Sequence, residues 1–290
     1  MEFFESYRKF SAKYMNKMVE PYLGHFNSIH HDIRMSNFNI MLREYVSMSA
    51  MSGVLAYIIS LPIVLIFSLL LFKSLLPIVA LVLLVPIGIA VGTFMTVLKY
   101  PAAQANGRKR SIDNNLPFAT LYMNTIAGTG APPYLMFKLL AEFKEYGEVS
   151  TEAASIVQSI DVMGQDIEVA MQRVAEDTPS DDLKDLLWSL ITTIVRGGDL
   201  KSLLGTKADS LMAAYRRKLD EYTNTLTMYV EVYITLVIVG AIFGMVMASI
   251  MGAISGFEGL RSMQILLVYV YLPMASILFI ALLKLTSPVG

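Results

Sequence analysis

Four long apolar stretches divide the chain, and each exceeds the roughly 18 residues that indicate a membrane-spanning helix. They run from about Ser49 to Phe72, Leu75 to Leu98, Met228 to Ile254, and Ile265 to Leu283. Only short segments separate the first stretch from the second and the third from the fourth. The pattern predicts two transmembrane hairpins with a long segment of mixed polarity between them.

The overall composition agrees with a membrane protein. The chain is 55% hydrophobic and 16% charged, with a mean hydropathy of +0.55, well away from the average of soluble domains. Its net charge of −1 gives no bulk attraction for nucleic acid, so no nucleic-acid partner is expected. The sequence has no cysteine, which excludes disulfides, thiol catalysis and thiolate metal ligands.

Basic residues predict the orientation of the hairpins. Residues 1–47 carry six Lys or Arg and residues 99–227 carry fourteen, whereas the two hairpin tips carry one each, Lys73 and Arg261. Lys and Arg are retained on the cytoplasmic side of a membrane. We therefore expect both termini and the central segment to be cytoplasmic and the tips to lie outside.

These patterns predict an all-α integral membrane protein of the cytoplasmic (inner) membrane, with four transmembrane helices flanking a cytoplasmic helical bundle. The expected parts are an amphipathic N-terminal segment (1–47), transmembrane hairpin 1 (48–99), the helical domain (100–227) and transmembrane hairpin 2 (228–290).

Helix start and stop residues divide the central segment into short helices. Pro117 is expected to start the first helix and Gly128 to end it, and Pro132 and Pro133 suit the first turn of the second. A third helix falls within 150–163 and stops at Gly164. Three residues are expected to cap the helices that follow: Asp166, Ser180 and Asp199.

The helix after Ser180 has the clearest apolar face. Its apolar residues recur at helical spacing, which indicates one side packed against a core: Leu183, Leu186, Leu187, Leu190, Ile191 and Ile194. The helix after Asp199 is expected to continue directly into the third span.

No constellation of reactive side chains accompanies these helices. We predict no catalytic residue, cofactor site or metal site, and therefore no enzyme. Glu231 is the only charged residue within a predicted span. An intramembrane carboxylate is a functional candidate, but at this depth it can also reach the interface or pair with a neighbouring helix, and both interpretations stay open.

Two basic clusters flank the central segment: Arg108, Lys109 and Arg110 after the second span, and Arg216, Arg217 and Lys218 before the third. One interpretation is topology retention with contact to anionic membrane lipid. The other is docking of an acidic partner protein, which requires these side chains to be exposed.

The third span carries small residues at every fourth position: Gly240, Gly244, Ala248, Gly252 and Gly256. Such a stripe lets a second helix approach closely, because van der Waals packing replaces the missing hydrophobic drive in lipid. The second helix belongs either to the same chain or to another copy.

A set of short motifs lies between the two hairpins: Ile112-Asp113-Asn114-Asn115-Leu116-Pro117, Ala127-Gly128, Gly164-Gln165-Asp166-Ile167, Ala170-Met171, Val174-Ala175, Thr178-Pro179-Ser180, Leu183, Leu186-Leu187 and Arg196-Gly197-Gly198-Asp199-Leu200. In this order, over roughly Ser111–Tyr222, they resemble the F-domain family of the type II secretion system. The stretch Leu42-Arg43-Glu44-Tyr45-Val46-Ser47 is similar to the archaeal branch.

The resemblance implies a platform protein of a type II secretion, type IV pilus, Tad-type pilus or archaellum machine. Such platforms dock a hexameric secretion ATPase from the cytoplasm and couple it to the assembly of pilin-like subunits. Many bacterial relatives have two F domains; this sequence has one, which implies a homodimer or a paralogous platform subunit. On this basis the two basic clusters become ATPase-contact candidates. The alternative is a small multi-pass transporter or channel subunit, which needs polar residues converging at mid-membrane.

Overall fold

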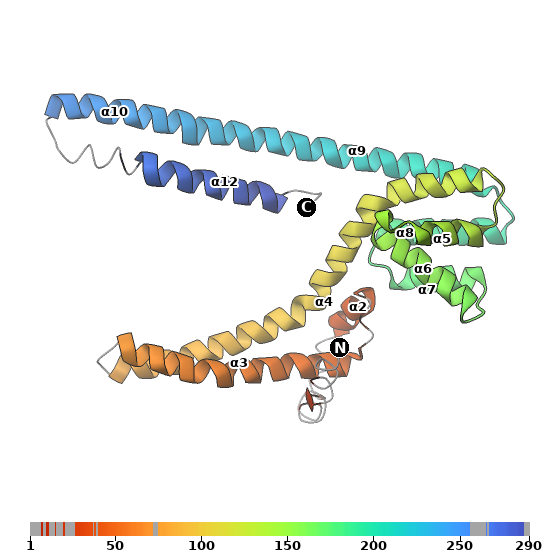
Figure 1. Ribbon diagram of the computed structural model, residues 1–290, viewed down its shortest axis with the longest axis horizontal. Helices are drawn as coiled ribbons and strands as arrows, with labels where there is room; N and C mark the ends of the chain where they lie inside the picture. The colour runs from red at the N-terminus through yellow and green to blue at the C-terminus, as the bar shows by residue number, and fades with distance from the viewer. Residues whose placement is uncertain are drawn as a thin grey trace. The chain divides into compact units, whose positions relative to one another are not determined.

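All the regular secondary structure in the residues that this computed structural model describes is helical, and these residues contain no β-strand (Figure 1). The described residues are 7, 10, 11, 15, 20, 27–36, 38, 40–71, 75–255, 265 and 267–286. The expected all-α class is confirmed. The chain divides into two compact units, Met1–Lys207 and Ala208–Gly290, which are described separately below.

The first unit begins with a helical hairpin. Helix α2 (Asn27–Met35) precedes α3 (Leu42–Leu71), which packs along the first half of α4 (Leu75–Ala127). At Gly53 the two helices approach closely, because a Cβ there would lie 3.2 Å from the Ala90 carbonyl oxygen. The Tyr45 hydroxyl donates to the Val97 carbonyl at 2.5 Å, which ties the start of α3 to the middle of α4.

Small polar residues line the buried face of α3. Ser49, Ser60 and Ser68 are buried, and each hydroxyl donates to a backbone carbonyl three or four residues earlier in the same helix. Their polar atoms are therefore satisfied without a partner on another helix. Small side chains with satisfied hydroxyls allow the close packing that holds helices together in lipid.

Helix α4 continues from the apolar stretch into the helical domain without a break. Pro86, Pro101 and Pro117 all lie inside it, so the expectation that a new helix starts at Pro117 is wrong. An internal proline removes one hydrogen bond and bends the helix, and α4 bends along its length in Figure 1. Burial of Leu116, Ala119 and Thr120 around Pro117 offsets the lost bond. The expected end at Gly128 is confirmed, since α4 ends at Ala127.

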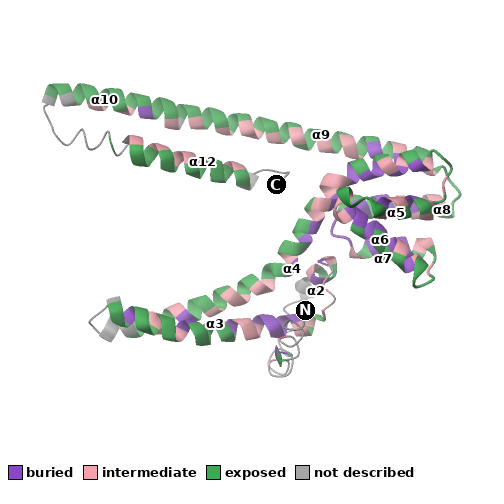
Figure 2. Ribbon diagram, viewed as in Figure 1, coloured by how far each residue is buried: buried purple, intermediate pink, exposed green. Residues whose placement is uncertain are grey.

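Four short helices form the helical domain together with the last part of α4. They are α5 (Pro133–Glu142), α6 (Glu148–Asp161), α7 (Ile167–Asp177) and α8 (Asp181–Val195), with a 3₁₀ turn, η2 (Lys144–Tyr146), before α6. Figure 2 shows that buried residues gather here. The core combines residues from α4 and all four helices: Ile112, Leu116, Met136, Leu140, Ile156, Met171, Leu186, Leu187 and Leu190.

The predicted caps and the leucine face are confirmed. The Asp166 carboxylate accepts from the Glu168 amide, the Ser180 hydroxyl from the Leu183 amide and the Asp199 carboxylate from the Lys201 amide. Each cap satisfies a backbone N–H that the first helical turn leaves unpaired. The four leucines of the predicted α8 face are buried, whereas Ile191 and Ile194 are partly exposed.

The second unit consists of long apolar helices. Helix α9 (Leu200–Tyr233) starts in the first unit and passes through a π-helical turn, η3 (Ile234–Val239), into α10 (Gly240–Ser255). A second π-helical turn, η4 (Leu267–Tyr271), leads into α12 (Leu272–Thr286). The rings of Tyr233 and Phe279 stack with centroids 4.5 Å apart. The hydroxyls of Tyr233 and Ser276 form a hydrogen bond of 2.9 Å, so both contacts join α9 to α12.

Three helical stretches are long and apolar enough to cross a bilayer: Leu42–Leu70, Val79–Ala127 and Leu200–Met251. They cover most of the first three predicted spans, and their length and composition point to a membrane protein. The fourth predicted span corresponds to a shorter apolar helix, Val268–Lys284. The count of four and the orientation remain predictions, and both predicted tip residues, Lys73 and Arg261, lie outside the described residues.

Gly147 is predicted to be the glycine of the helical domain that tolerates a side chain least. Its φ of 56° with ψ of −128° is a region that other residues avoid. A Cβ there would also lie 2.8 Å from the Ser111 Oγ. Gly147→Ala is expected to lower the free energy of unfolding by about 1–3 kcal/mol from backbone strain, plus the cost of the clash, measured by thermal unfolding followed by circular dichroism.

Two control variants separate these two costs. Gly130 has a φ of 76° but open space around it, and Gly107 lies within α4 with open space as well. Gly130→Ala is expected to lower the free energy of unfolding through backbone strain alone. Gly107→Ala is expected not to lower it, because Ala favours a helix more than Gly does. Equal unfolding temperatures for Gly147→Ala and Gly130→Ala would contradict the close approach to Ser111.

Candidate functional site

The Arg108 side chain joins three helices in the first unit. From α4, its Nε donates to Glu148 Oε2 at 3.0 Å and its Nη2 to Glu152 Oε1 at 2.7 Å, both on α6. Its Nη1 donates to the Met35 carbonyl at the end of α2 at 2.5 Å. The Arg108 and Glu152 side chains are each only 10% exposed. A buried charge is tolerated only when it is paired in this way.

Local structure places each of these partners. Glu148 and Glu152 are four residues apart on α6, so their side chains lie on the same face of the helix. Met35 is the last residue of α2, and the last carbonyls of a helix have no partner within it. The planar guanidinium, with its five N–H donors, matches two carboxylates and a carbonyl at once. Arg108 therefore binds the N-terminal segment and the helical domain to α4.

A second ion pair connects α2 to α7. Arg34 donates from Nε and Nη2 to one Asp177 oxygen, at 3.0 and 2.6 Å. Both side chains are largely exposed, at 54% and 41%. Exposed pairs contribute about 0–1 kcal/mol, so this contact positions α2 but stabilises it little.

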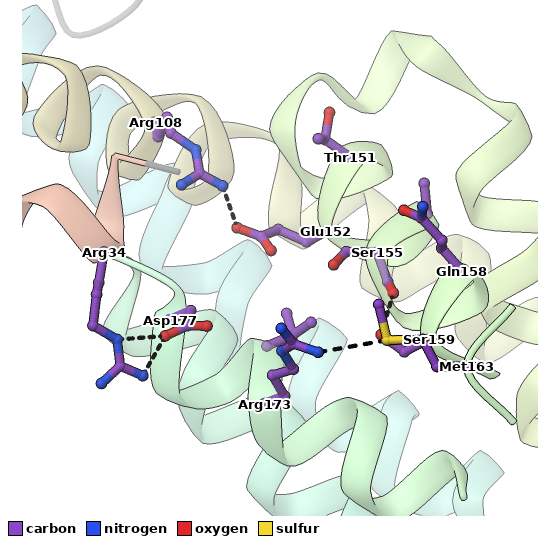
Figure 3. Close-up of a pocket in the computed structure, with 12 residues that line it drawn as sticks. Arg34, Arg108, Thr151, Glu152, Ser155, Gln158, Ser159, Met163, Arg173 and Asp177 are labelled. Carbon is purple, nitrogen blue, oxygen red and sulfur yellow. Dashed lines mark hydrogen bonds and ion pairs between the residues drawn. The ribbon is translucent and has the colours of Figure 1, made fainter. Parts of the chain in front are cut away.

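Between these two contacts lies a polar cavity of about 380 Å³. Figure 3 shows arginines from three helices around it, Arg34 from α2, Arg108 from α4 and Arg173 from α7. Polar side chains of α6 form the facing wall, among them Thr151, Ser155 and Gln158. The cavity joins the N-terminal segment, the α4 helix and the helical domain, and it is the candidate functional site.

Burial raises the pKa of Glu152 to about 7, and the nearby carboxylates Glu148 and Asp177 act in the same direction. The Arg108 guanidinium opposes both effects. Loss of water around the carboxylate outweighs its short ion pair with Arg108, because burial penalises the charged form. The Glu152 carboxyl group therefore gains or loses its proton as the pH passes through about 7.

The structure corrects one premise about the basic clusters. Arg108 was expected to be exposed, and it is buried in the ion pairs with Glu148 and Glu152. Lys109 is partly exposed and pairs with Asp181 at 2.5 Å. The other four candidates are exposed: Arg110, Arg216, Arg217 and Lys218. Whether any of them contacts an ATPase stays a prediction.

The membrane candidates lie on α9 and α10. Glu231 is exposed on α9. Gly240, Gly244, Ala248 and Gly252 lie in α10, whereas Gly256 lies outside the described residues. A Cβ added at Gly240 would meet nothing within 4 Å. Within the described residues of the second unit, therefore, nothing packs against the stripe at this position.

Sequence reasoning missed the partners of Arg108 and the cavity. Glu148 and Glu152 are an acidic pair at helical spacing, which indicates a shared face but not what it binds. Arg108 lies 40 and 44 residues earlier in the chain, and no periodicity relates positions so far apart. Nothing in the sequence pattern distinguishes Arg34, Arg173 or Asp177 from ordinary surface charges.

Comparison with known proteins identifies the helical domain. Residues 119–248 match the family model of type II secretion system (T2SS) protein F. The chain is 25% identical over 189 residues to an uncharacterized protein of Methanocaldococcus jannaschii, covering 63% of this chain and 32% of the relative. It is 27% identical over 151 residues to flagella accessory protein J of the same organism, covering 52% of this chain and 26% of that relative.

These matches confirm the resemblance to the F-domain family, including its archaeal branch. The matched part runs from within α4 to within α10, further toward the C-terminus than the motifs indicated. The chain spans only about a third and about a quarter of the lengths of the two relatives that it matches. No solved structure matches the chain.

Stability is predicted to depend on pH through Glu152. Its pKa of about 7 in the folded chain lies above the ordinary 4.5, so its contribution is fully present below pH 4.5 and is lost as pH rises through 7. The free energy of unfolding is expected to fall by about 2 kcal/mol between pH 5.5 and 8.5. Fluorescence of the single tryptophan, Trp188 on α8, follows unfolding of the helical domain.

Glu152→Gln is expected to remove this dependence, because the amide keeps an acceptor for Arg108 but does not titrate. Glu145→Gln, at an exposed carboxylate on η2, is the matched control and should retain it. An unchanged pH dependence in Glu152→Gln would show that another group is responsible.

Proposed function

We propose, from the premise that residues 119–248 are a protein F domain of the type II secretion family, that this platform-type membrane protein transmits force in a filament-assembly machine. In this proposal a hexameric secretion ATPase docks on the cytoplasmic helical domain. Its motion passes to the membrane helices, which guide pilin-like subunits into or out of the filament. The chain itself acts as a scaffold without turnover.

The continuity of α4 carries this proposal. One helix of 53 residues contributes both the second predicted span and part of the helical domain. In the domain, its residues Ile112, Leu116 and Met123 lie in the core. An α-helix has no soft joint comparable to a loop, so movement of the domain reaches the membrane segment directly. Helix α9 supports the same reading, since it runs through η3 into α10.

The exposed basic residues at the end of this route are proposed as the ATPase contact. Arg216 and Arg217 are exposed on α9, and Arg110 is exposed on α4. An acidic surface on the partner would be steered toward them, because complementary charge speeds association and fixes its orientation. Arg108 is removed from this set, because its guanidinium holds α2 and α6 instead.

The membrane helices are proposed to form the other contacts. The exposed apolar surface of α10 includes Ile242, Phe243, Val246 and Ile250, and it would meet lipid and the hydrophobic helices of filament subunits. The stripe of small residues on α10 is proposed to pack against a second copy or a paralogous platform subunit. Open space at Gly240 within the second unit leaves room for such a partner.

Charge reversal at the proposed contact should weaken ATPase binding. Arg216→Glu with Arg217→Glu replaces attraction by repulsion and is expected to lower recovery of the cognate secretion ATPase on the order of tenfold, measured by co-purification in mild detergent. Stimulation of ATP hydrolysis should fall in parallel, while membrane insertion stays intact.

Arg196→Glu is the control, since Arg196 is exposed at the end of α8, outside both basic clusters. Equal ATPase recovery from the double variant and this control would remove Arg216 and Arg217 from the contact. If the folded wild-type protein binds no ATPase at micromolar concentration but carries solute across liposomes, the transporter alternative replaces the platform.

A bulky residue in the small-residue stripe should disturb self-association. Gly244→Leu fills the space that a second helix needs, so native mass spectrometry in detergent is expected to show a shift from dimer to monomer. Val246→Leu adds bulk elsewhere on α10 and should leave the dimer unchanged. A monomeric wild-type protein, or a dimer unaffected by Gly244→Leu, would contradict the proposed role of the stripe.

A further inference from the structure

One wall of the cavity between α2, α4, α6 and α7 presents unused hydrogen-bond donors. Thr151, Ser155 and Gln158 line it from α6, at a spacing that places them on one face of the helix. Within the part of the chain that the structure describes, none of these three side chains has a hydrogen-bond partner. The wall is therefore ready to donate to a ligand with several oxygen acceptors.

The opposite side of the cavity supplies positive charge that is available for binding. Arg173 approaches only the Met163 sulfur, at 3.7 Å, and among the described residues no carboxylate pairs with it. Arg34 pairs with Asp177 at the surface, and such a pair is readily exchanged because it is weak. The Arg108 guanidinium is already paired with Glu148 and Glu152, so it forms part of the cavity wall and is not counted as a ligand-binding group.

The balance of charge at this cavity favours an anion. Three arginines line it against two carboxylates, Glu152 and Asp177, while Glu148 pairs with Arg108 from outside the lining. Two of the three guanidiniums, those of Arg34 and Arg173, remain free to face a ligand once the surface pair opens. Guanidinium groups bind phosphate oxygens through paired hydrogen bonds.

We propose that this cavity binds a small phosphate-bearing anion through Arg173, Arg34 and the α6 side chains Thr151, Ser155 and Gln158. Its volume of about 380 Å³ lies in the range of small-molecule pockets. No aromatic ring lines it, so nothing is present to stack a nucleobase, and recognition rests on the phosphate groups. This proposal does not depend on the role of the chain in filament assembly.

A soluble anion fits the position of the cavity better than a lipid headgroup. Arg108 lies ten residues beyond Leu98, where the second predicted span ends, which corresponds to about 15 Å along a helix. The bound anion would bridge α6 and α7 to α2. It would thus replace the weak exposed pair of Arg34 and Asp177 as the link between α2 and the helical domain.

Calorimetric titration of pyrophosphate into the full chain tests the proposal. The protein is reconstituted in nanodiscs of phosphatidylcholine, with or without phosphatidylglycerol. Saturable binding is expected in both membranes, with the dissociation constant raised at least tenfold by Arg173→Gln. Ser155→Ala with Gln158→Ala, which alters no charge, should also weaken binding several-fold. Arg196→Gln, an exposed arginine away from the cavity, is the matched control and should bind as the wild type does.

Three results would overturn the proposal: no saturable binding to the folded wild-type protein, equal losses in Arg173→Gln and Arg196→Gln, or unchanged binding in both cavity variants. Pyrophosphate binding in phosphatidylcholine that disappears when phosphatidylglycerol is present would assign the site to a lipid headgroup and overturn its assignment to a soluble anion.

Discussion

The first unit depends on a buried guanidinium that has all its strong partners on other helices. Arg108 on α4 contacts two carboxylates of α6 and the last carbonyl of α2. Removing Arg108 leaves the Glu152 carboxylate without its ion-pair partner in a site that is nearly closed to water, which is strongly destabilising. The same contacts form one end of the polar cavity, whereas burial of Glu152 raises its pKa against the effect of Arg108. The link between the three helices and one end of the cavity therefore have one structural origin.

This buried ion pair acts on a helix that already joins membrane and cytoplasm. Because α4 passes from the predicted span into the core of the helical domain, a continuous helix and not a flexible linker connects the domain to this span. Arg108 then ties the segment before the first span to the same helix. A partner that moves the helical domain would therefore act on the first hairpin through α4 and through α2. This arrangement fits the proposed role in relaying movement.

Short-range sequence patterns correctly predicted the features that depend on residues near in the chain. The caps Asp166, Ser180 and Asp199, the helix end at Gly128 and the buried leucines of α8 all depend on contacts within one or two turns. Long-range packing decided the rest. Pro117 usually starts a helix, but burial of its neighbours keeps it inside α4. A basic run beside a span usually lies in solvent, but Glu148 and Glu152 draw Arg108 inside. The residues around the cavity come from four helices, and no spacing along the chain brings Arg34 and Arg173 together.

The central claim is that α4 transmits movement as one continuous helix, and a distance between spin labels tests it directly. The chain has no cysteine, so Val91→Cys and Leu121→Cys, both at exposed positions, can be labelled selectively in the full-length protein in nanodiscs. The account predicts a single narrow distribution at or somewhat below about 45 Å, from 30 residues of helix with proline bends. A broad distribution would reveal a hinge between the two labels and would contradict transmission through α4.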